Sequence, residues 1–172
     1  MYLTNVVCSA HLGCNLNLTE LCYQLSNVRY DPARFSGLMW QHRTIGGNCL
    51  AFSSGIIQCQ GKATSLREGV QRLRRYARIL QKKGLEVELQ RVKVLTASAC
   101  HVLSAPLDFN ALIKERCVTC EPELFPTANF QVDGITFSCF HTGKIIITGI
   151  KKLSDTDQTI HPTLMELELY TT

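Results

Sequence analysis

The clearest hydrophobic periodicity in the chain lies in residues 65–84. Its apolar positions recur at intervals of four, three, four and three residues: Leu66, Val70, Leu73, Ala77 and Leu80. This spacing predicts a helix with one apolar face, and Gly84 is the expected stop. A shorter helix is predicted after Asn17, a capping residue that has Glu20 three positions later.

The remaining apolar stretches are short and are bounded by turn residues, which is typical of strands. They cover residues 4–12, 35–41, 49–53, 56–60 and 91–100, followed by three more segments after residue 122. The expected turns between neighbouring strands are Gly46-Gly47, Ser54-Gly55, Asp133-Gly134 and Thr142-Gly143. A short helix is expected near residues 108–115, and Pro162 must start or kink any helix in the last segment.

One sequence pattern occurs twice. FSSGIIQCQG at residues 52–61 returns as FHTGKIIITG at residues 140–149, and an acidic-Pro-x-x-Phe segment precedes each copy. Each half of the chain therefore has a strand, a helix, several antiparallel strands and a helix. Such a duplication predicts a pseudo-twofold α+β fold, in which the strands of both repeats, residues 1–90 and 91–172, form one antiparallel sheet with helices on one face.

The other sheet face is left open to solvent or to a ligand. The two-residue period of a strand gives the side chains that point toward it. The expected sets are Asn5, Val7 and Ser9; Asn48, Leu50 and Phe52; Thr136, Ser138 and Phe140; and Lys144, Ile146 and Thr148.

Composition adds a charge asymmetry to this picture. The chain has 172 residues, of which 45% are hydrophobic, and a formal net charge of +4. Residues 1–84 carry about +8 and residues 85–172 about −4, which favours different partners for the two halves or an acidic partner for the first. Because no apolar run reaches the length of a membrane span and the start lacks the layout of a secretory signal, we expect a soluble intracellular protein.

Candidate reaction chemistry is sparse. The nine cysteines are scattered singly, so reduced core thiols are the expected interpretation. The one CxxC pair, Cys117 and Cys120, lacks a second ligand pair, so a metal site is not expected. No nucleophile with a paired base and no glycine-rich phosphate loop is present, and we expect neither an enzyme nor a cofactor.

Several segments resemble the core domain of the TATA-binding protein family of transcription initiation factors. TNVV resembles its first strand, YDPARF and CEPELFP its two stirrup turns, and the two Phe-x-x-Gly segments its phenylalanine hairpins. RRYARILQKKG resembles its first convex helix, and IHPTL the end of its last helix. The resemblance runs across nearly the whole chain and implies a saddle, with one continuous curved antiparallel sheet and the helices on the convex face.

The resemblance also implies a ligand, A·T-rich promoter DNA, bound in the minor groove by the concave face. Strand phenylalanines are usually buried, but the duplication and the stirrup turns favour four exposed rings that wedge into base steps at the two ends of the site. The wedges are Phe35 and Phe52, and Phe125 and Phe140. The other implied DNA contacts are Asn5, Val7, Arg34, Leu50, Thr96, Ser98, Lys144, Ile146 and Thr148.

The floor between the wedges departs from the family pattern. Thr96 stands where the family has a second Asn. Gln58 and Gln60 replace small apolar or Thr residues, Thr136 and Ser138 replace aliphatic residues, and Ser98 replaces Val. Basic phosphate contacts are replaced at Gln41, Gln131 and Ile56. A more polar and less basic floor predicts weaker binding with a shallower salt dependence, so the sequence supports the DNA-binding mode better than TATA selectivity.

The long helix carries an excess of basic residues: Arg67, Arg72, Arg74, Arg75, Arg78, Lys82 and Lys83, against Glu68. A solvated face, a nucleic-acid contact and a protein-binding surface are all open interpretations. The resemblance favours a partner surface, because Arg75 and Tyr76 match residues used by general transcription factor IIA. Glu121 and Glu123 lie in the second stirrup, whose acidic residues meet general factor IIB in the family.

Two functions follow from these patterns. The first is an initiation factor, acting in the nucleus or at a site of viral transcription, that binds and bends promoter DNA and recruits other factors. The second is an adaptor with the same fold that binds transcription factors or regulators and has weak or no TATA binding. Self-association through the apolar saddle is a further expectation.

Overall fold

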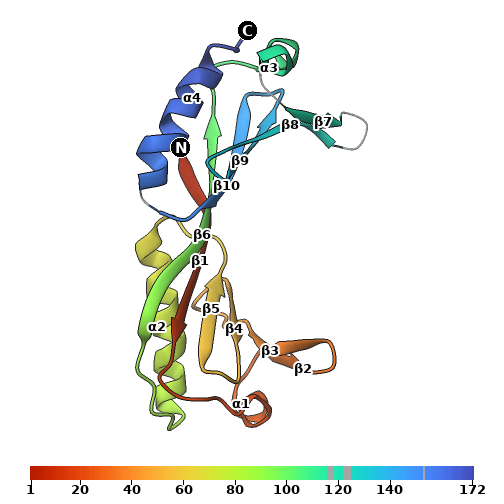
Figure 1. Ribbon diagram of the computed structural model, residues 1–172. Coiled ribbons are helices and arrows are strands. Elements are labelled where there is room, and N and C mark those ends of the chain that lie inside the picture. Colours follow the sequence, from red (N-terminus) through yellow and green to blue (C-terminus); the bar gives the residue numbers. More distant parts are fainter. Residues whose placement is uncertain (116–117, 122–124, 153) are drawn as a thin grey trace. The chain divides into compact units, whose positions relative to one another are not determined.

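The computed structural model describes residues 1–115, 118–121, 125–152 and 154–172, with backbone alone at residues 115, 120, 121 and 125 (Figure 1). The hydrogen-bonded strand order is β2-β3-β4-β5-β1-β6-β10-β9-β8-β7. The chain divides into two compact units, here called the first unit, Asn5–Leu95, and the second unit, Met1–Thr4 with Thr96–Thr172. The strands β1 (Tyr2–His11) and β6 (Gln90–Val102) contribute residues to both units. The repeats 1–90 and 91–172 remain our proposal for the ancestral duplication.

The first unit follows the predicted order of elements closely. Its remaining elements are α1 (Leu18–Gln24), β2 (Val28–Asp31), β3 (Phe35–Trp40), β4 (Asn48–Ala51), β5 (Ile56–Gln60) and α2 (Leu66–Lys82). The predicted cap of α1 is confirmed, since Asn17 accepts a hydrogen bond from the Glu20 N–H at 3.2 Å. Ser65 caps α2 in the same way. Gly84 follows α2 with a φ of +91°, a left-handed conformation that suits glycine after a helix.

The second unit repeats this order with a different end. It contains α3 (Phe109–Glu115), β7 (Thr119–Glu121), β8 (Phe125–Val132), β9 (Ile135–Phe140), β10 (Lys144–Ile150), a π-helical turn η1 (Thr156–Ile160) and α4 (His161–Glu168). Asp133 and Gly134 form the predicted two-residue hairpin, with φ values of +50° and +78°. Pro162 lies in the first turn of α4, directly after η1, as a helix-starting proline should.

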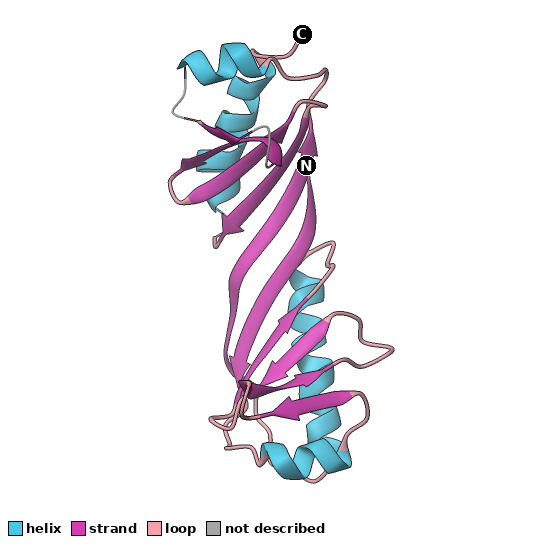
Figure 2. Ribbon diagram, turned by 90° about the vertical axis from the view of Figure 1, so that its right-hand side faces the viewer, coloured by secondary structure: helices cyan, strands magenta, loops and turns pink. Residues whose placement is uncertain are grey.

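In each unit the long helix packs across one face of the strands (Figures 1 and 2). In the first unit α2 lies so close to β1 that a Cβ at Gly69 would stand 2.9 Å from the Cys8 Sγ. The core beneath α2 is centred on Trp40 and Tyr76, whose rings meet edge to face at 4.8 Å. In the second unit Phe130 and Phe137 stack in parallel at 5.3 Å, among buried isoleucines of β10. In each unit the hydrophobic core therefore lies between the strands and the long helix.

Some elements lie outside the sequence-based prediction. The short edge strands β2 and β7 pair with β3 and β8, and neither was expected as a strand. The Gly46-Gly47 turn is part of a seven-residue connection from Gln41 to Gly47 and is not a tight hairpin. The seven cysteines whose side chains are described are free thiols. None of the helices in the described residues combines the length and the apolar character needed to cross a bilayer.

Candidate nucleic-acid interface

In each unit, the face of the strands that carries no long helix is here called the open face. In the first unit the strand register places one continuous row of side chains on it: Arg29, Met39, Leu50, Gln58 and Ser9. In the second unit the corresponding row is Asn129, Ser138, Ile146 and Cys100. The predicted sets of face residues on β4, β9 and β10 are confirmed, because their neighbours at odd positions, such as Cys49 and Ile145, are buried on the helix side.

An aromatic pair stands at the outer end of the open face of the first unit. The rings of Phe35 and Phe52 meet edge to face with centroids 5.9 Å apart, and Phe35 is 38% exposed. Gly37 lies under them, and a Cβ there would be 2.6 Å from Phe35 Cε1 and 3.0 Å from Phe52 Cε1. The rings therefore need a residue without a side chain at position 37 to lie in this arrangement.

The hairpin that carries Phe52 is fixed by its backbone. The Gly55 N–H donates to the Phe52 carbonyl at 2.9 Å, and the Leu12 N–H donates to the Gly55 carbonyl at 2.8 Å. Gly55 has a φ of +83° and lies directly against the Cys14 carbonyl, so no other residue type fits there without a shift. The second unit has the same bonds, from Gly143 to Phe140 and from Leu103 to Gly143, both at 2.9 Å.

The ring of Phe140 has different neighbours from those of Phe52. Thr127 lies opposite it in the β8–β9 register and is completely buried. The Lys144 ammonium lies 6.0 Å from the centroid of the Phe140 ring, at the limit of a cation–π contact. The Phe125 side chain lies outside the described residues, so its pairing with Phe140 stays a prediction.

The floor residues lie on the open face with different degrees of exposure. Asn5 accepts a hydrogen bond from the Gly61 N–H through Oδ1 at 2.9 Å, which leaves its NH2 group to donate to a ligand. Val7 is only 7% exposed. Lys144 is exposed, and the half-buried predicted contacts are Leu50, Thr96, Ser98, Ile146 and Thr148.

Arg34 lies at the rim, beside Phe35. Its side chain is 85% exposed, and its Nε is 3.6 Å from the Asp31 carboxylate. An ion pair this exposed contributes little to stability, so the guanidinium can turn to a phosphate at small cost.

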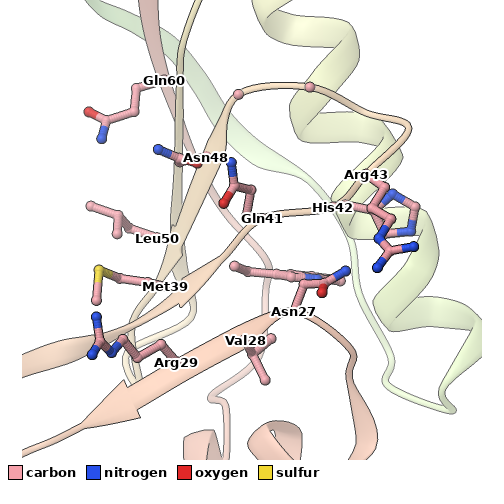
Figure 3. A pocket seen from close by; sticks show the side chains of 13 residues that line it. Asn27, Val28, Arg29, Met39, Gln41, His42, Arg43, Asn48, Leu50 and Gln60 are labelled. Atoms are coloured by element: carbon pink, nitrogen blue, oxygen red, sulfur yellow. The ribbon is translucent and has the colours of Figure 1, made fainter.

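A hollow of about 670 Å³ indents the open face of the first unit. In Figure 3 the amide side chains of Gln60, Asn48, Gln41 and Asn27 lie along it. Arg29 and Leu50 also line it. This hollow was not expected from the sequence, although the amides at alternate positions of β4 and β5 indicate a polar surface.

The helix α2 presents basic side chains to solvent, and the exposed ones are Arg67, Arg74, Arg75, Arg78, Lys82 and Lys83. Two expectations for this helix need correction. Arg72 is 8% exposed, and its guanidinium pairs with Glu68 at 2.8 Å and donates to the Lys62 carbonyl. Arg72 is therefore a buried structural residue and not part of the basic surface.

Tyr76 is the second correction. It is fully buried against Trp40, and its hydroxyl oxygen accepts a hydrogen bond from the His42 N–H at 3.2 Å. Burial raises the pKa of Tyr76 to about 12. A partner at this surface can touch Arg75 but not the Tyr76 ring.

The acidic residues expected to meet a partner cannot be placed. The backbone of Glu121 ends β7, but its side chain is not among the described ones, and Glu123 lies outside the described residues. Among the residues that the structure does describe, no group of three or more His, Cys, Asp or Glu side chains is arranged to hold a metal ion.

Comparison with known proteins identifies close relatives across the whole chain. The family model described as "Transcription factor TFIID (or TATA-binding protein, TBP)" matches residues 1–83 and 91–170. The chain is 33% identical over 157 residues to TATA box-binding protein-like 2 of Rattus norvegicus, covering 89% of this chain and 45% of that protein. It is 32% identical over 171 residues to TATA-box-binding protein 1 of Arabidopsis thaliana, covering 95% and 85%.

The fold agrees with this sequence similarity. Methanococcus jannaschii TBP superposes with a TM-score of 0.85 at 25% identity, covering 97% of both chains. The expected fold class is thereby confirmed. The chain spans less than half the length of the rat relative and most of the length of the plant relative.

Proposed function

Because the chain belongs to the TATA-binding protein family and is a TBP-like transcription factor, we propose that it binds promoter DNA in the minor groove with the open faces of its two units. Phe35 with Phe52, and Phe125 with Phe140, act as wedges that enter base steps and bend the duplex. The other residues proposed to contact the DNA are Asn5, Val7, Arg34, Leu50, Thr96, Ser98, Lys144, Ile146 and Thr148. This is the activity of an initiation factor in the nucleus, or at a site of viral transcription.

The observation that carries this proposal is the Phe35–Phe52 pair on Gly37. An aromatic pair with one exposed ring, Phe35, and one half-buried ring, Phe52, has the shape and the chemistry of a wedge. Unstacking a base step costs on the order of a few kcal/mol, which stacking and burial of the inserted rings offset. Although Phe35 packs on Gly37 and Phe52, it remains 38% exposed, so part of the ring is available to a ligand.

The charges around the wedges support a weakly electrostatic mode of binding. Arg34 and Lys144 are exposed beside the Phe35 and Phe140 rings, respectively. We expect each of them to meet a phosphate. Gln41 and Gln131 are exposed and uncharged at rim positions. Since salt dependence scales with the number of neutralised phosphates, we expect a shallow dependence of affinity on salt.

The recruiting surface in this proposal is the exposed basic side of α2. Arg75 lies on it and would contact general factor IIA or an equivalent acidic partner, whose approach the surrounding Arg and Lys residues would accelerate at low salt. Contacts of Glu121 and Glu123 with general factor IIB rest on the family resemblance.

The test is a gel-shift and fluorescence-transfer bending assay on a TATA duplex over a salt series. We expect the Phe35→Ala/Phe52→Ala variant to lose sharp bending and at least about ten-fold in affinity, consistent with the loss of two stacked rings. Tyr23→Ala is the control, because Tyr23 is an exposed aromatic residue on the helix α1, which carries none of the proposed DNA contacts. Large thermal destabilisation of the double variant would place the rings in the core and contradict the proposal.

A second candidate function is the adaptor that binds proteins and not DNA. The polar floor favours it, because Gln58, Gln60, Ser98 and Ser138 are half-buried on the open face and suit hydrogen bonds to a protein segment. Failure of the folded wild-type protein to bind any duplex at low salt would select this function. A pull-down with the wild-type protein as bait would then identify the partner. A Gln58 variant used as bait should no longer capture it.

A further inference from the structure

Two glutamines occupy the open face of β5, an interior strand of the first unit. Gln58 lies opposite Leu50 on β4 and Ser9 on β1, and Gln60 lies opposite Asn48. Both glutamine side chains are half-buried. Within the described part of the chain, neither side-chain amide has a hydrogen-bond partner. In Figure 3 the amide of Gln60 projects from the strand beside Asn48 and Leu50.

The second unit has no amide on the matching strand. In the register of β10 with β6 and β9, Ile146 and Thr148 hold the positions of Gln58 and Gln60. Its amides are on the outer strand β8, where the Asn129 Nδ2 donates to Thr127 Oγ1 and the Gln131 Nε2 donates to Thr136 Oγ1, both at 3.0 Å. The interior of the open face is thus amide-bearing in the first unit and aliphatic with a hydroxyl in the second.

The difference between the amides of the first unit and the aliphatic and hydroxyl side chains of the second matters for the base pairs that each unit can recognise in the minor groove. An A·T pair presents only acceptors there, whereas a G·C pair adds one donor, the guanine N2 amine. A carboxamide has both an acceptor oxygen and a donor NH2. If Gln58 and Gln60 are pressed into a pure A·T groove, the NH2 groups find acceptors but the amide oxygens are left without donors, and a buried polar atom without a partner is costly.

We propose that Gln58 and Gln60 accept hydrogen bonds from guanine N2 amines, so that the half of the DNA site under the first unit contains G·C pairs. This rests on the proposed function, and concerns which sequence the same face selects. Ile146 and Thr148 offer no comparable acceptor pair, so the half-site under the second unit stays A·T-rich. The difference between the units would also fix the direction in which the protein lies on its site.

The first test moves a G·C pair step by step through an A·T duplex and measures the affinity of the wild-type protein at each step. We expect tighter binding, by about five- to ten-fold for one added hydrogen bond, at steps in one half of the site only. Inosine is then placed at the same steps. An inosine·C pair lacks the N2 amine and otherwise keeps the G·C geometry, so the gain should disappear.

The second test removes the amides with little change in volume. Gln58→Met/Gln60→Met should bind the guanine and inosine duplexes equally and the all-A·T duplex at least as tightly as the wild type does. The matched control is Ile146→Met/Thr148→Val in the second unit. Because both residues are proposed DNA contacts, this variant can change the affinity for every duplex, but the ratio of its affinities for the guanine and inosine duplexes should stay as in the wild type. Circular dichroism melts verify that all variants are folded.

The outcomes separate this inference from the proposed function. Wild-type protein that binds no duplex overturns both. Wild-type protein that bends the A·T duplex but gains nothing from guanine, or gains equally from inosine, overturns the inference alone. A guanine preference that survives in the Gln58→Met/Gln60→Met variant also overturns it, because the preference would then belong to other residues.

Discussion

The two units hold their phenylalanine rings on the same hairpin but over different residues. In the first unit Phe52 and Phe35 lie on the bare backbone of Gly37, whereas in the second unit Phe140 lies opposite the buried side chain of Thr127. The hairpin bonds from Gly55 and Gly143 are the same to within 0.1 Å. The two units therefore share the backbone that places the ring, while the residues beneath the ring differ.

The helix layers differ in the same sense. The first unit anchors α2 with a charged strut, Arg72 paired with Glu68, and with Tyr76 against Trp40. The second unit buries hydroxyls instead, and Thr159 donates to the Asp133 carboxylate at 3.0 Å. The helix of each unit is thus held to the strands by different contacts. Substitutions can show which of these contacts stability depends on.

The largest expected effect is on the aromatic cores. Trp40→Ala should lower the free energy of unfolding by about 3–5 kcal/mol, as removal of a large buried ring does. Trp40 is 2% exposed and links β3 to α2 through Tyr76. Phe130→Ala at the matching position of the second unit should cost about as much. Urea denaturation monitored by far-UV circular dichroism measures the free energy of unfolding of both variants. Tryptophan fluorescence is unsuitable, because Trp40 is the only tryptophan and Trp40→Ala removes it.

Met39→Ala is the control for these core variants. Met39 neighbours Trp40 on β3 but points to the open face and is 41% exposed. Its loss should therefore change the free energy of unfolding by less than about 1 kcal/mol. A loss below about 1 kcal/mol for Trp40→Ala would contradict the assignment of the ring to the core.

An exchange of the residues beneath the rings should have an intermediate effect. Gly37→Thr introduces into the first unit the residue type that the second unit has at Thr127. The new Cβ would displace the Phe35 ring, whose contacting atoms are at the far end of a side chain that can rotate. We expect bending to fall while the free energy of unfolding changes by less than about 1 kcal/mol. The reciprocal Thr127→Gly should lower stability by about 1–2 kcal/mol, because it opens a small cavity and loosens a strand.

The fluorescence-transfer bending assay and thermal melts of both variants make this comparison. Ser36→Thr, at an exposed neighbouring position of β3, controls for the added volume. Unchanged bending by folded Gly37→Thr protein would show that the arrangement of Phe35 on Gly37 is not needed for a wedge.

Local signals account for most of what the sequence predicted correctly. The Asn17 cap, the limits of α2 and the Asp133-Gly134 hairpin depend on residues close together in the chain. The strands β2 and β7 were missed because they have four and three residues, too few to show a periodicity. Tyr76 was misassigned although its spacing, three after Leu73 and four before Leu80, places it on the apolar side of α2.

The parts of the site that were missed depend on distant residues. Arg72 is buried because Glu68, four residues earlier on α2, and the Lys62 carbonyl surround its guanidinium. The spacing from Glu68 is visible in the sequence, but the contact with Lys62 outside the helix is not. The hollow beside Asn48 and Gln60 forms only when β2 to β5 are paired side by side. The positions of Phe35, Phe52 and Phe140 were predictable because the sequence repeat marks them, whereas that of the Phe125 ring stays a prediction.

The smallest expected effect concerns the carboxylates at the starts of the two helical segments. Glu68 accepts a hydrogen bond from the Thr64 N–H at 2.8 Å, and Asp155 accepts from the Lys151 and Lys152 N–H groups at 2.9 Å. These backbone donors lower the pKa of each carboxyl. A lowered folded-state pKa stabilises the protein above the unfolded-state value, about 4.3 for Glu and 3.9 for Asp. That stabilisation is lost as the pH falls through the folded-state pKa.

We therefore expect the free energy of unfolding to decrease as the pH falls below about 4, and Glu68→Gln and Asp155→Asn each to make that decrease shallower. The Glu68 effect should be the larger, because its carboxylate also pairs with the buried Arg72, although solvent screens both groups. Urea denaturation at a series of pH values measures this, with Asp157→Asn on η1 as the charge control. Equal slopes in the wild type and both variants would show that neither helix start depends on its carboxylate.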